Sequence, residues 1–140
     1  MELRDATFDD FPILLDIMRQ VHDESVFKGM AMNEAIVQRN FVVSMNFEDG
    51  YAKVITRKGR IVGGLVGIIA DNQFGIRCAQ DLFNHSLAGT DRLIKDFLRW
   101  AQIRDTKFVL ITDLTGNPRY VKLCRTLGLE AIGTNLMKVM

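Results

Sequence analysis

Apolar residues recur near the N-terminus first at strand spacing and then at helical spacing. Residues 2–6 make a short candidate strand. Over residues 11–21 apolar side chains return every three or four positions, which is the period of an amphipathic helix. Because Pro12 is comfortable only in a first turn, we expect this helix to begin after an N-cap at Asp9 or Asp10.

The middle of the chain changes from a helical period to a strand period. A weaker helix is predicted after a cap at Asn33. Residues 51–57 are rich in β formers, and Lys58-Gly59 then favours a hairpin turn into residues 61–70. Valine and isoleucine occur on both faces of this second strand, so we expect it to be central in a sheet that is covered on both sides. Residues 76–84 are interpreted as a third strand of the meander.

The strongest helical pattern in the chain lies over residues 91–101, with apolar side chains on one face and charged side chains on the other. Residues 107–113 then form a strand. A strand, a helix and a second strand in this order predict a crossover unit, in which the strands of 76–84 and 107–113 run parallel.

The C-terminal part is predicted to add one more helix and one more strand. Asn117 as N-cap and Pro118 at the first helical position open the helix, and Gly128 ends it. A final strand is expected over residues 131–139. The predicted order is therefore β α α β β β α β α β, an α/β chain with a mixed sheet.

Length and composition narrow the class of protein. The 140 residues predict one domain, 1–140, and 48% apolar with 25% charged residues is a globular composition. A net charge of +1 disfavours a binder of nucleic acid or of an anionic membrane. The longest apolar run, 61–70, is about half of what a spanning helix needs, and no secretory signal is readable. Two cysteines without metal-ligand spacing favour free thiols in the cytoplasm and no metal site.

Four segments resemble the GCN5-related N-acetyltransferase superfamily, and the resemblance covers nearly the whole chain. They are residues 60–67 in the central hairpin, 80–83 on the strand that faces the cofactor, 93–101 in the following helix, and 117–129. The last segment is similar to the superfamily's penultimate helix, Asn-x-x-Ala-x-x-Leu-Tyr-x-x-Leu-Gly-Phe. Together with residues 22–25, the pattern looks most like the short acetyltransferase-like proteins of tailed bacteriophages. The resemblance implies the superfamily's fold and acetyl-coenzyme A as acyl donor.

A pyrophosphate site is expected near residues 86–92, because the N-terminus of a crossover helix offers free amides and a positive dipole to phosphate. Superfamily members build this turn with Arg/Gln-x-x-Gly-x-Gly/Ala, whereas residues 85–90 here read His-Ser-Leu-Ala-Gly-Thr, so both motif glycines are displaced. The cofactor-binding residues that we expect are Leu82, Phe83, Ala88, Gly89, Thr90, Asp91, Arg92 and Asn117.

Acetyl transfer needs a base for the amine and an acid for the departing thiolate. Cys124 stands where the superfamily often has its tyrosine acid, and Tyr120 lies one turn earlier on the same face. A buried structural role for Cys124 is the alternative, since free cysteine is among the most buried residue types. Asp81 is the candidate base, with Glu24, His22 and His85 as other choices.

Two functions of different classes follow. The first is direct transfer of an acetyl group from acetyl-coenzyme A to an amine of a small molecule or a protein. The second is a catalytically inert acetyltransferase-like module that serves as an interaction or virion-associated protein. The displaced glycines favour the second, while Asn117 and the crossover unit favour the first. The acceptor is not encoded in any readable motif, and the oligomeric state is open, with a homodimer as one option.

Overall fold

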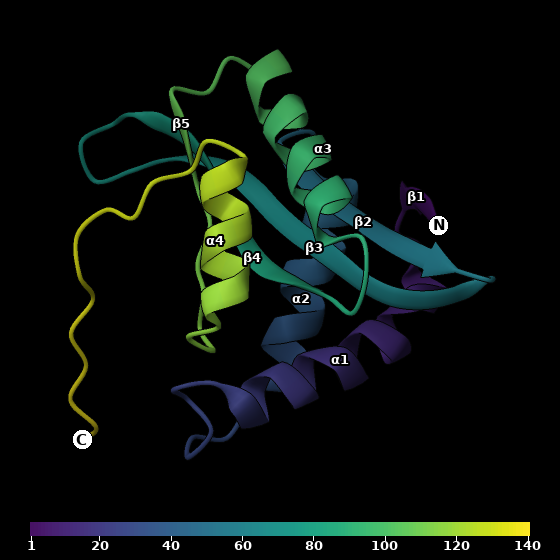
Figure 1. Cartoon of the computed structure of the whole chain (residues 1–140). Helices are drawn as coiled ribbons and strands as arrows, with labels where there is room; N and C mark the ends of the chain where they lie inside the picture. The colour runs from purple at the N-terminus through teal and green to yellow at the C-terminus, as the bar shows by residue number, and fades with distance from the viewer.

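The computed structural model describes residues 1–140, which fold into a five-stranded sheet with helices on both faces (Figure 1). The strands lie in chain order, with antiparallel pairing from the first to the fourth and parallel pairing between the last two. They are β1 (Glu2–Asp5), β2 (Gly50–Arg57), β3 (Arg60–Asp71), β4 (Arg77–Ser86) and β5 (Phe108–Leu110). The fold class and the crossover unit predicted from the sequence are confirmed.

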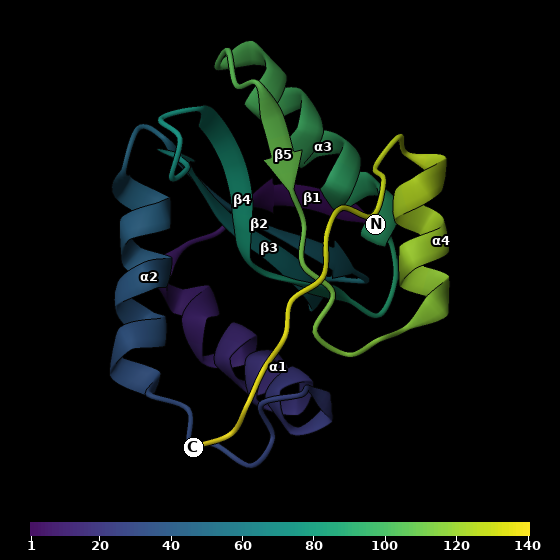
Figure 2. The same ribbon diagram turned by 90° about the vertical axis from the view of Figure 1, so that its left-hand side faces the viewer.

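Four α-helices and one short 3₁₀ turn, Phe8–Asp10, accompany the sheet. The helices are α1 (Phe11–Glu24), α2 (Glu34–Asn46), α3 (Thr90–Ile103) and α4 (Pro118–Thr126). Figure 2 shows the sheet between α1 and α2 on one side and α3 and α4 on the other. No helix is both long enough and apolar enough to cross a membrane.

The helix caps stand where the sequence places them. The Asn33 side chain accepts a hydrogen bond from the Ile36 amide at 3.2 Å, and Asn117 accepts one from the Arg119 amide at 3.0 Å. Asp10 occupies the N-cap position of α1, but its carboxylate accepts hydrogen bonds from the guanidinium of Arg4, at 2.8 and 3.0 Å. This ion pair joins β1 to the start of α1.

Alternation along β2 and β3 divides the apolar side chains between two cores. Tyr51, Ile55, Leu65 and Ile69 point to the face that α3 covers, where they meet Phe97. The residues between them point to the opposite face and pack on α1 and α2; they are Ala52, Val54 and Val66, which meet Phe11, Leu14, Leu15 and Phe41. The central strand is therefore apolar on both sides, as its sequence predicts.

Two predicted strands are corrected by the structure. The strand expected over residues 107–113 forms only at Phe108–Leu110, because the Thr112 amide donates to the Asp81 carboxyl instead of to a neighbouring strand. The side chain of Asp113 then accepts hydrogen bonds from the amides of Thr115 and Gly116 and turns the chain toward α4.

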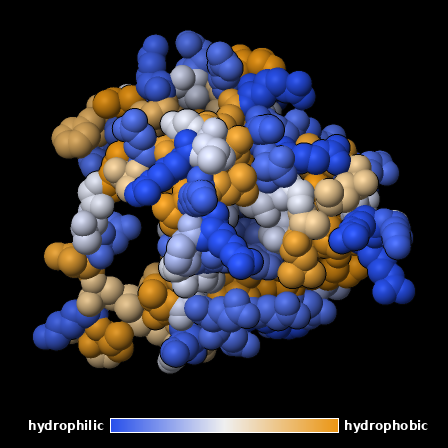
Figure 3. Space-filling view, viewed as in Figure 1, coloured by the Kyte–Doolittle hydropathy of each residue, from blue (hydrophilic) through white to orange (hydrophobic).

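The final strand predicted over residues 131–139 is absent. Every residue of 131–140 is exposed, and Leu136 keeps 93% of its surface in contact with solvent. A strand requires a partner edge for its backbone hydrogen bonds. Residues 131–140 leave the end of α4 and run apart from the sheet, and Figure 3 shows an open gap between this C-terminal segment and the body of the protein. The outer edge of β5 consequently remains unpaired.

Gly67 of β3 is a position where the fold has no room for a side chain. A Cβ built there would lie 2.8 Å from a ring carbon of Phe97 and 2.9 Å from the Gln80 carbonyl oxygen. We expect Gly67→Ala to lower the free energy of unfolding by about 1–3 kcal/mol, because it over-packs the contact between α3 and the sheet. Urea denaturation measures the change.

Gly29 provides the matched control, because it has no atom within 4 Å of its Cβ position. Gly29→Ala is expected to stay within about 0.5 kcal/mol of wild type. Equal stability of the Gly67→Ala and Gly29→Ala proteins would contradict the close packing of α3 on β3.

Candidate functional site

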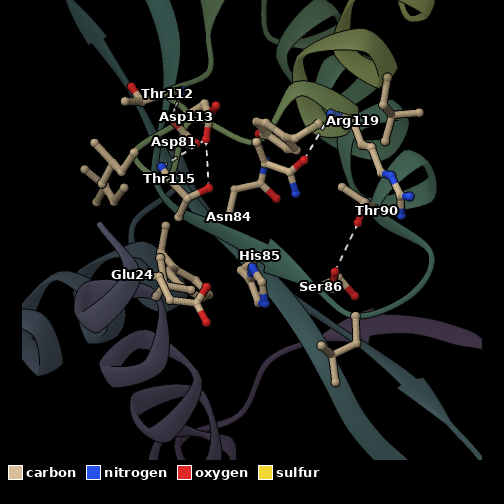
Figure 4. Close-up of a pocket in the computed structure, with 18 residues that line it drawn as sticks. Glu24, Asp81, Asn84, His85, Ser86, Thr90, Thr112, Asp113, Thr115 and Arg119 are labelled. Carbon is tan, nitrogen blue, oxygen red and sulfur yellow. Dashed lines mark hydrogen bonds between the residues drawn. The ribbon is translucent and has the colours of Figure 1, made fainter. Parts of the chain in front are cut away.

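The candidate site is a cavity of about 460 Å³ that opens where β4 and β5 separate. The two strands pair only from Cys78 to Gln80 on β4, and β4 then continues to Ser86 without a partner on that edge. Ligands commonly bind beyond the carboxyl ends of parallel strands in open sheets. The walls come from α1, β4, the segment after β5, and α4 (Figure 4).

A bulge in β4 decides which side chains of that strand face the cavity. Asp81 pairs with Gly67 and Phe83 pairs with Val66, so Leu82 has no partner in β3. The extra residue reverses the alternation beyond it. Asp81 and Asn84, three residues apart, consequently lie on the same face, toward α3 and α4, while His85 lies toward α1.

Asp81 is a carboxyl poised for proton exchange near neutral pH. Burial raises its pKa to about 7, although a hydrogen bond from the Thr112 amide, 3.1 Å from the carboxyl oxygen, favours the charged form. A carboxyl with such a pKa in a cavity is a typical general base.

Tyr120 reaches the same cavity from α4. Its hydroxyl oxygen accepts a hydrogen bond from Nδ2 of Asn84 at 2.6 Å. Burial raises the pKa of Tyr120 well above its ordinary value, and the neighbouring Cys124 and Asp81 raise it further. The phenol therefore keeps its proton throughout the physiological pH range, so it can donate a proton but cannot serve as a base.

Cys124 lies outside this cavity. It lines a separate apolar groove of about 870 Å³ between α4, β5 and the start of the C-terminal segment, and burial raises the pKa of its thiol. Tyr120 borders both spaces. Of the three expected catalytic residues, the structure thus brings Asp81 and Tyr120 to one cavity. It places Cys124 in the neighbouring groove, on the other side of Tyr120.

The loop that is expected to bind phosphate is held by hydrogen bonds between its own residues. The Ser86 hydroxyl hydrogen bonds to the carbonyl and the amide of Ala88, and Gly89 adopts a φ of +71° as the N-cap of α3. A Cβ on Gly89 would overlap the side chain of Ile55, so this residue packs onto β2. The amides of Gly89 and Asp91 donate to no group of the protein, which leaves them free for an anion.

The other expected cofactor residues divide into two groups. Leu82, Phe83, Thr90 and Asn117 line the cavity. Ala88, Gly89, Asp91 and Arg92 do not: the Asp91 carboxylate lies 3.8 Å from the ammonium of Lys95, and the Arg92 guanidinium donates to the Met1 carbonyl at 2.7 Å. No group of three or more His, Cys, Asp or Glu residues is placed to hold a metal ion.

Glu24 and His85 also line the cavity, whereas His22 does not. Burial lowers the pKa of His85, so its imidazole is neutral at pH 7. Sequence reasoning missed Asn84 and Arg119 on the cavity wall. A signal for Arg119 exists, since it is the second residue of a helix whose Asn-Pro start is readable. Asn84 has no such signal, because only the bulge turns it toward Tyr120.

Comparison with known proteins identifies the fold. No family model matches the sequence, and no curated protein matches it. Among solved structures, a Bacillus halodurans protein is similar with a TM-score of 0.79 at 12% identity over 100% of this chain and 99% of its own. The ribosomal-protein-alanine N-acetyltransferase of Brucella melitensis biovar Abortus 2308 has a TM-score of 0.68 at 13% identity, with both chains fully covered.

A third similar structure is an aminoglycoside acetyltransferase from an uncultured soil metagenomic sample, in complex with sisomicin. Its TM-score is 0.70 at 13% identity, over 99% of this chain and 95% of its own. At these identities the likeness shows the fold alone. That fold is the one of the GCN5-related N-acetyltransferases.

The raised pKa of Asp81 predicts a pH-dependent contribution to stability. The folded protein keeps a proton that the unfolded chain releases between pH about 4 and about 7. The resulting stabilisation is complete below pH 4 and is lost as the pH rises through 7. Asp81→Asn cannot ionise and still offers an acceptor to the Thr112 amide. Relative to wild type, we expect this variant to gain on the order of 2 kcal/mol between pH 5 and pH 8.

Urea unfolding of both proteins at the two pH values measures this gain. A difference between variant and wild type that does not change with pH would show that the carboxyl of Asp81 is well hydrated, against the buried position described above.

Proposed function

We propose that this protein is an N-acetyltransferase, which moves an acetyl group from acetyl-coenzyme A directly to an amine. One observation carries the proposal: Asp81 and Tyr120 share the wall of one cavity, the first with a pKa of about 7 and the second held in its protonated form. Direct amide formation requires one group that accepts a proton and one that donates a proton. The pair supplies both, in a fold that named acetyltransferases share.

The cavity wall fits acetyl-coenzyme A, which has phosphates at one end and an amide-bearing arm that ends in the thioester. The Thr90 hydroxyl and the exposed Arg119 line the cavity and suit the phosphates. The free amides of Gly89 and Asp91, the residues on either side of Thr90 in the sequence, lie beyond this wall and could add to the phosphate site. The partnerless edge of β4 at Leu82 and Phe83 presents backbone groups that suit the amides of the arm. Asn117 lines the same wall. When bound, the thioester supplies an activated acyl group.

Asp81 takes the proton that the amine loses as its nitrogen bonds to the acyl carbon. Tyr120 gives its proton to the sulfur as the carbon–sulfur bond breaks, and the products are an amide and a free thiol. Asp81 then releases its proton to water, and Tyr120 recovers one. Neither residue forms a bond to the acyl group, so no covalent intermediate on the protein is needed.

The acceptor amine, on a small molecule or a protein, would enter from the side of Glu24. There the Val26 amide donates to the Leu114 carbonyl at 3.3 Å, which links the loop after α1 to the loop before α4. Glu24 lines the cavity beneath this link and forms no ion pair within the protein. A carboxylate at the entrance favours an amine that arrives as its ammonium form, which releases one proton to water before its nitrogen can attack.

Acetyl-coenzyme A is expected to raise the melting temperature, because a ligand that binds only the folded state stabilises it by about 2.7 kcal/mol at a hundredfold excess over Kd. Differential scanning fluorimetry with millimolar acetyl-coenzyme A measures the shift. The absence of any shift would overturn the proposed function and favour an inert interaction module.

Arg119→Ala tests the phosphate end of the cavity. We expect it to weaken the binding of acetyl-coenzyme A about 10- to 150-fold, which corresponds to about 1.5–3 kcal/mol for a hydrogen bond to a charged group. Arg125→Ala is the matched control, since Arg125 is also an exposed arginine of α4 but does not line this cavity. Isothermal titration calorimetry compares the two variants, and equal losses would exclude a specific role for Arg119.

Tyr120→Phe and Cys124→Ala separate the two candidate acids. Tyr120→Phe is expected to lower kcat about 100-fold or more with little change in acetyl-coenzyme A affinity, because the proton is needed only in the transition state. Cys124→Ala is expected to cost about 1 kcal/mol of stability through a small cavity and to leave the rate per folded molecule unchanged. Initial rates and melting curves measure both effects, and a slow Cys124→Ala with a normal Tyr120→Phe would reverse the assignment.

A further inference from the structure

Asn84 holds the hydroxyl of Tyr120 in one orientation. Its Nδ2 donates to the Tyr120 oxygen at 2.6 Å, across 36 residues of sequence and from β4 to α4. The other end of the same amide, Oδ1, is buried and has no hydrogen-bond partner. The Tyr120 hydroxyl is therefore the one hydrogen-bond partner that the structure gives this side-chain amide.

The direction of this hydrogen bond decides where the phenolic proton lies. A tyrosine hydroxyl has one proton and can also accept a hydrogen bond. When its oxygen accepts from Asn84, its own proton must point to a different acceptor. The structure records no hydrogen bond from the Tyr120 hydroxyl to another group of the protein. A leaving thiolate is a charged acceptor, so it can take this proton.

We propose that Asn84 is the positioning residue for Tyr120: by donating to the hydroxyl oxygen, it directs the phenolic proton away from β4 and stabilises the phenolate that remains after proton transfer. The inference rests on the proposed function, because it assigns Asn84 a part in the proton donation by Tyr120.

The site needs such a donor. Burial and the nearby carboxyl of Asp81 both oppose a negative charge on Tyr120. A hydrogen bond to the charged form of a group offsets this effect, and such bonds are stronger than bonds between neutral groups. The amide of Asn84 is the hydrogen-bond donor that the structure places on the phenol oxygen.

The bulge at Leu82 makes the contact available. In a regular strand, residues 81 and 84 would point to opposite faces, because side chains alternate. With one extra residue, both face α4, so a single strand delivers the candidate base and the partner of the candidate acid. Asn84 is opposite Leu65, whose side chain belongs to the core under α3.

A titration tests the direction of the hydrogen bond without any enzyme assay. The chain has two tyrosines, so both can be replaced by 3,5-difluorotyrosine, and a Tyr51→Phe version assigns the ¹⁹F signal of residue 120. Asn84→Leu keeps a side chain of similar volume but removes the donor. We expect this change to raise the pKa of the residue 120 phenol, since the phenolate loses a stabilising donor. A lowered pKa would mean that Tyr120 donates to Asn84, and an unchanged pKa would mean that Asn84 does not stabilise the phenolate; either result would overturn the inference.

Kinetics test the consequence for acetyl transfer. Asn84→Leu and Asn84→Asp are expected to lower kcat about 10- to 100-fold, with the KM for acetyl-coenzyme A within about threefold of wild type. The double variant Asn84→Leu/Tyr120→Phe is expected to be no slower than Tyr120→Phe alone, because Asn84 acts through Tyr120. Additive losses in the double variant, or a change confined to KM, would overturn the inference.

The titration and the kinetics test the inference and the proposed function separately. If wild type transfers no acetyl group to any amine of a broad panel, the proposed function fails. The ¹⁹F titration then still decides whether Asn84 donates to Tyr120, because it requires only the folded protein.

Discussion

A single extra residue in β4 is the constraint on which the candidate site depends. Side chains on a strand alternate strictly between its two faces, and the partnerless Leu82 interrupts this alternation once. Before the interruption, Ala79 belongs to the core beneath α3; after it, Phe83 packs on the core beneath α1. The same strand can therefore contribute to two hydrophobic cores and still turn Asp81 and Asn84 toward a common cavity.

The opening of the cavity depends on which acceptor the Thr112 amide donates to. If the Thr112 amide continued the pairing of β5 with β4, the two strands would stay together and leave no space between them. Because that amide donates to the carboxyl of Asp81, the pairing ends at Gln80 and the strands separate. The carboxyl of Asp81 then lies beside the opening between the two strands, where burial raises its pKa. The same hydrogen bond therefore holds the chain after β5 and fixes the position of the candidate base.

Much of the fold could be predicted from the sequence because it depends on local signals. The caps at Asn33 and Asn117, the turn at Lys58-Gly59 and the strong period of α3 are properties of short segments, and all are confirmed. The strand expected over residues 131–139 was wrong, because these residues extend into solvent and leave the outer edge of β5 unpaired. The propensity of a segment for strand does not determine whether it docks on an edge.

The candidate site was predictable only in part, for a related reason. Asp81 and Tyr120 could be singled out by residue type and by position on a strand and a helix. Cys124 was placed in the same group by sequence position alone, and the turn of α4 puts it on the far side of Tyr120. The hydrogen bond between Asn84 and Tyr120 joins residues 36 positions apart and depends on the bulge in β4. Neither the composition of the sequence nor its hydrophobic period indicates this bulge.

The aromatic cluster beneath α3 gives this protein a built-in optical probe. Trp100 is the only tryptophan of the chain, and its ring stacks on Phe97 at 5.4 Å, meets Tyr51 at 5.2 Å and lies under the guanidinium of Arg104. It borders neither the cavity of Asp81 nor the groove of Cys124. Its emission therefore reports on whether α3 is docked against the sheet. One intrinsic signal can thus follow the loss of this helix from the core during unfolding.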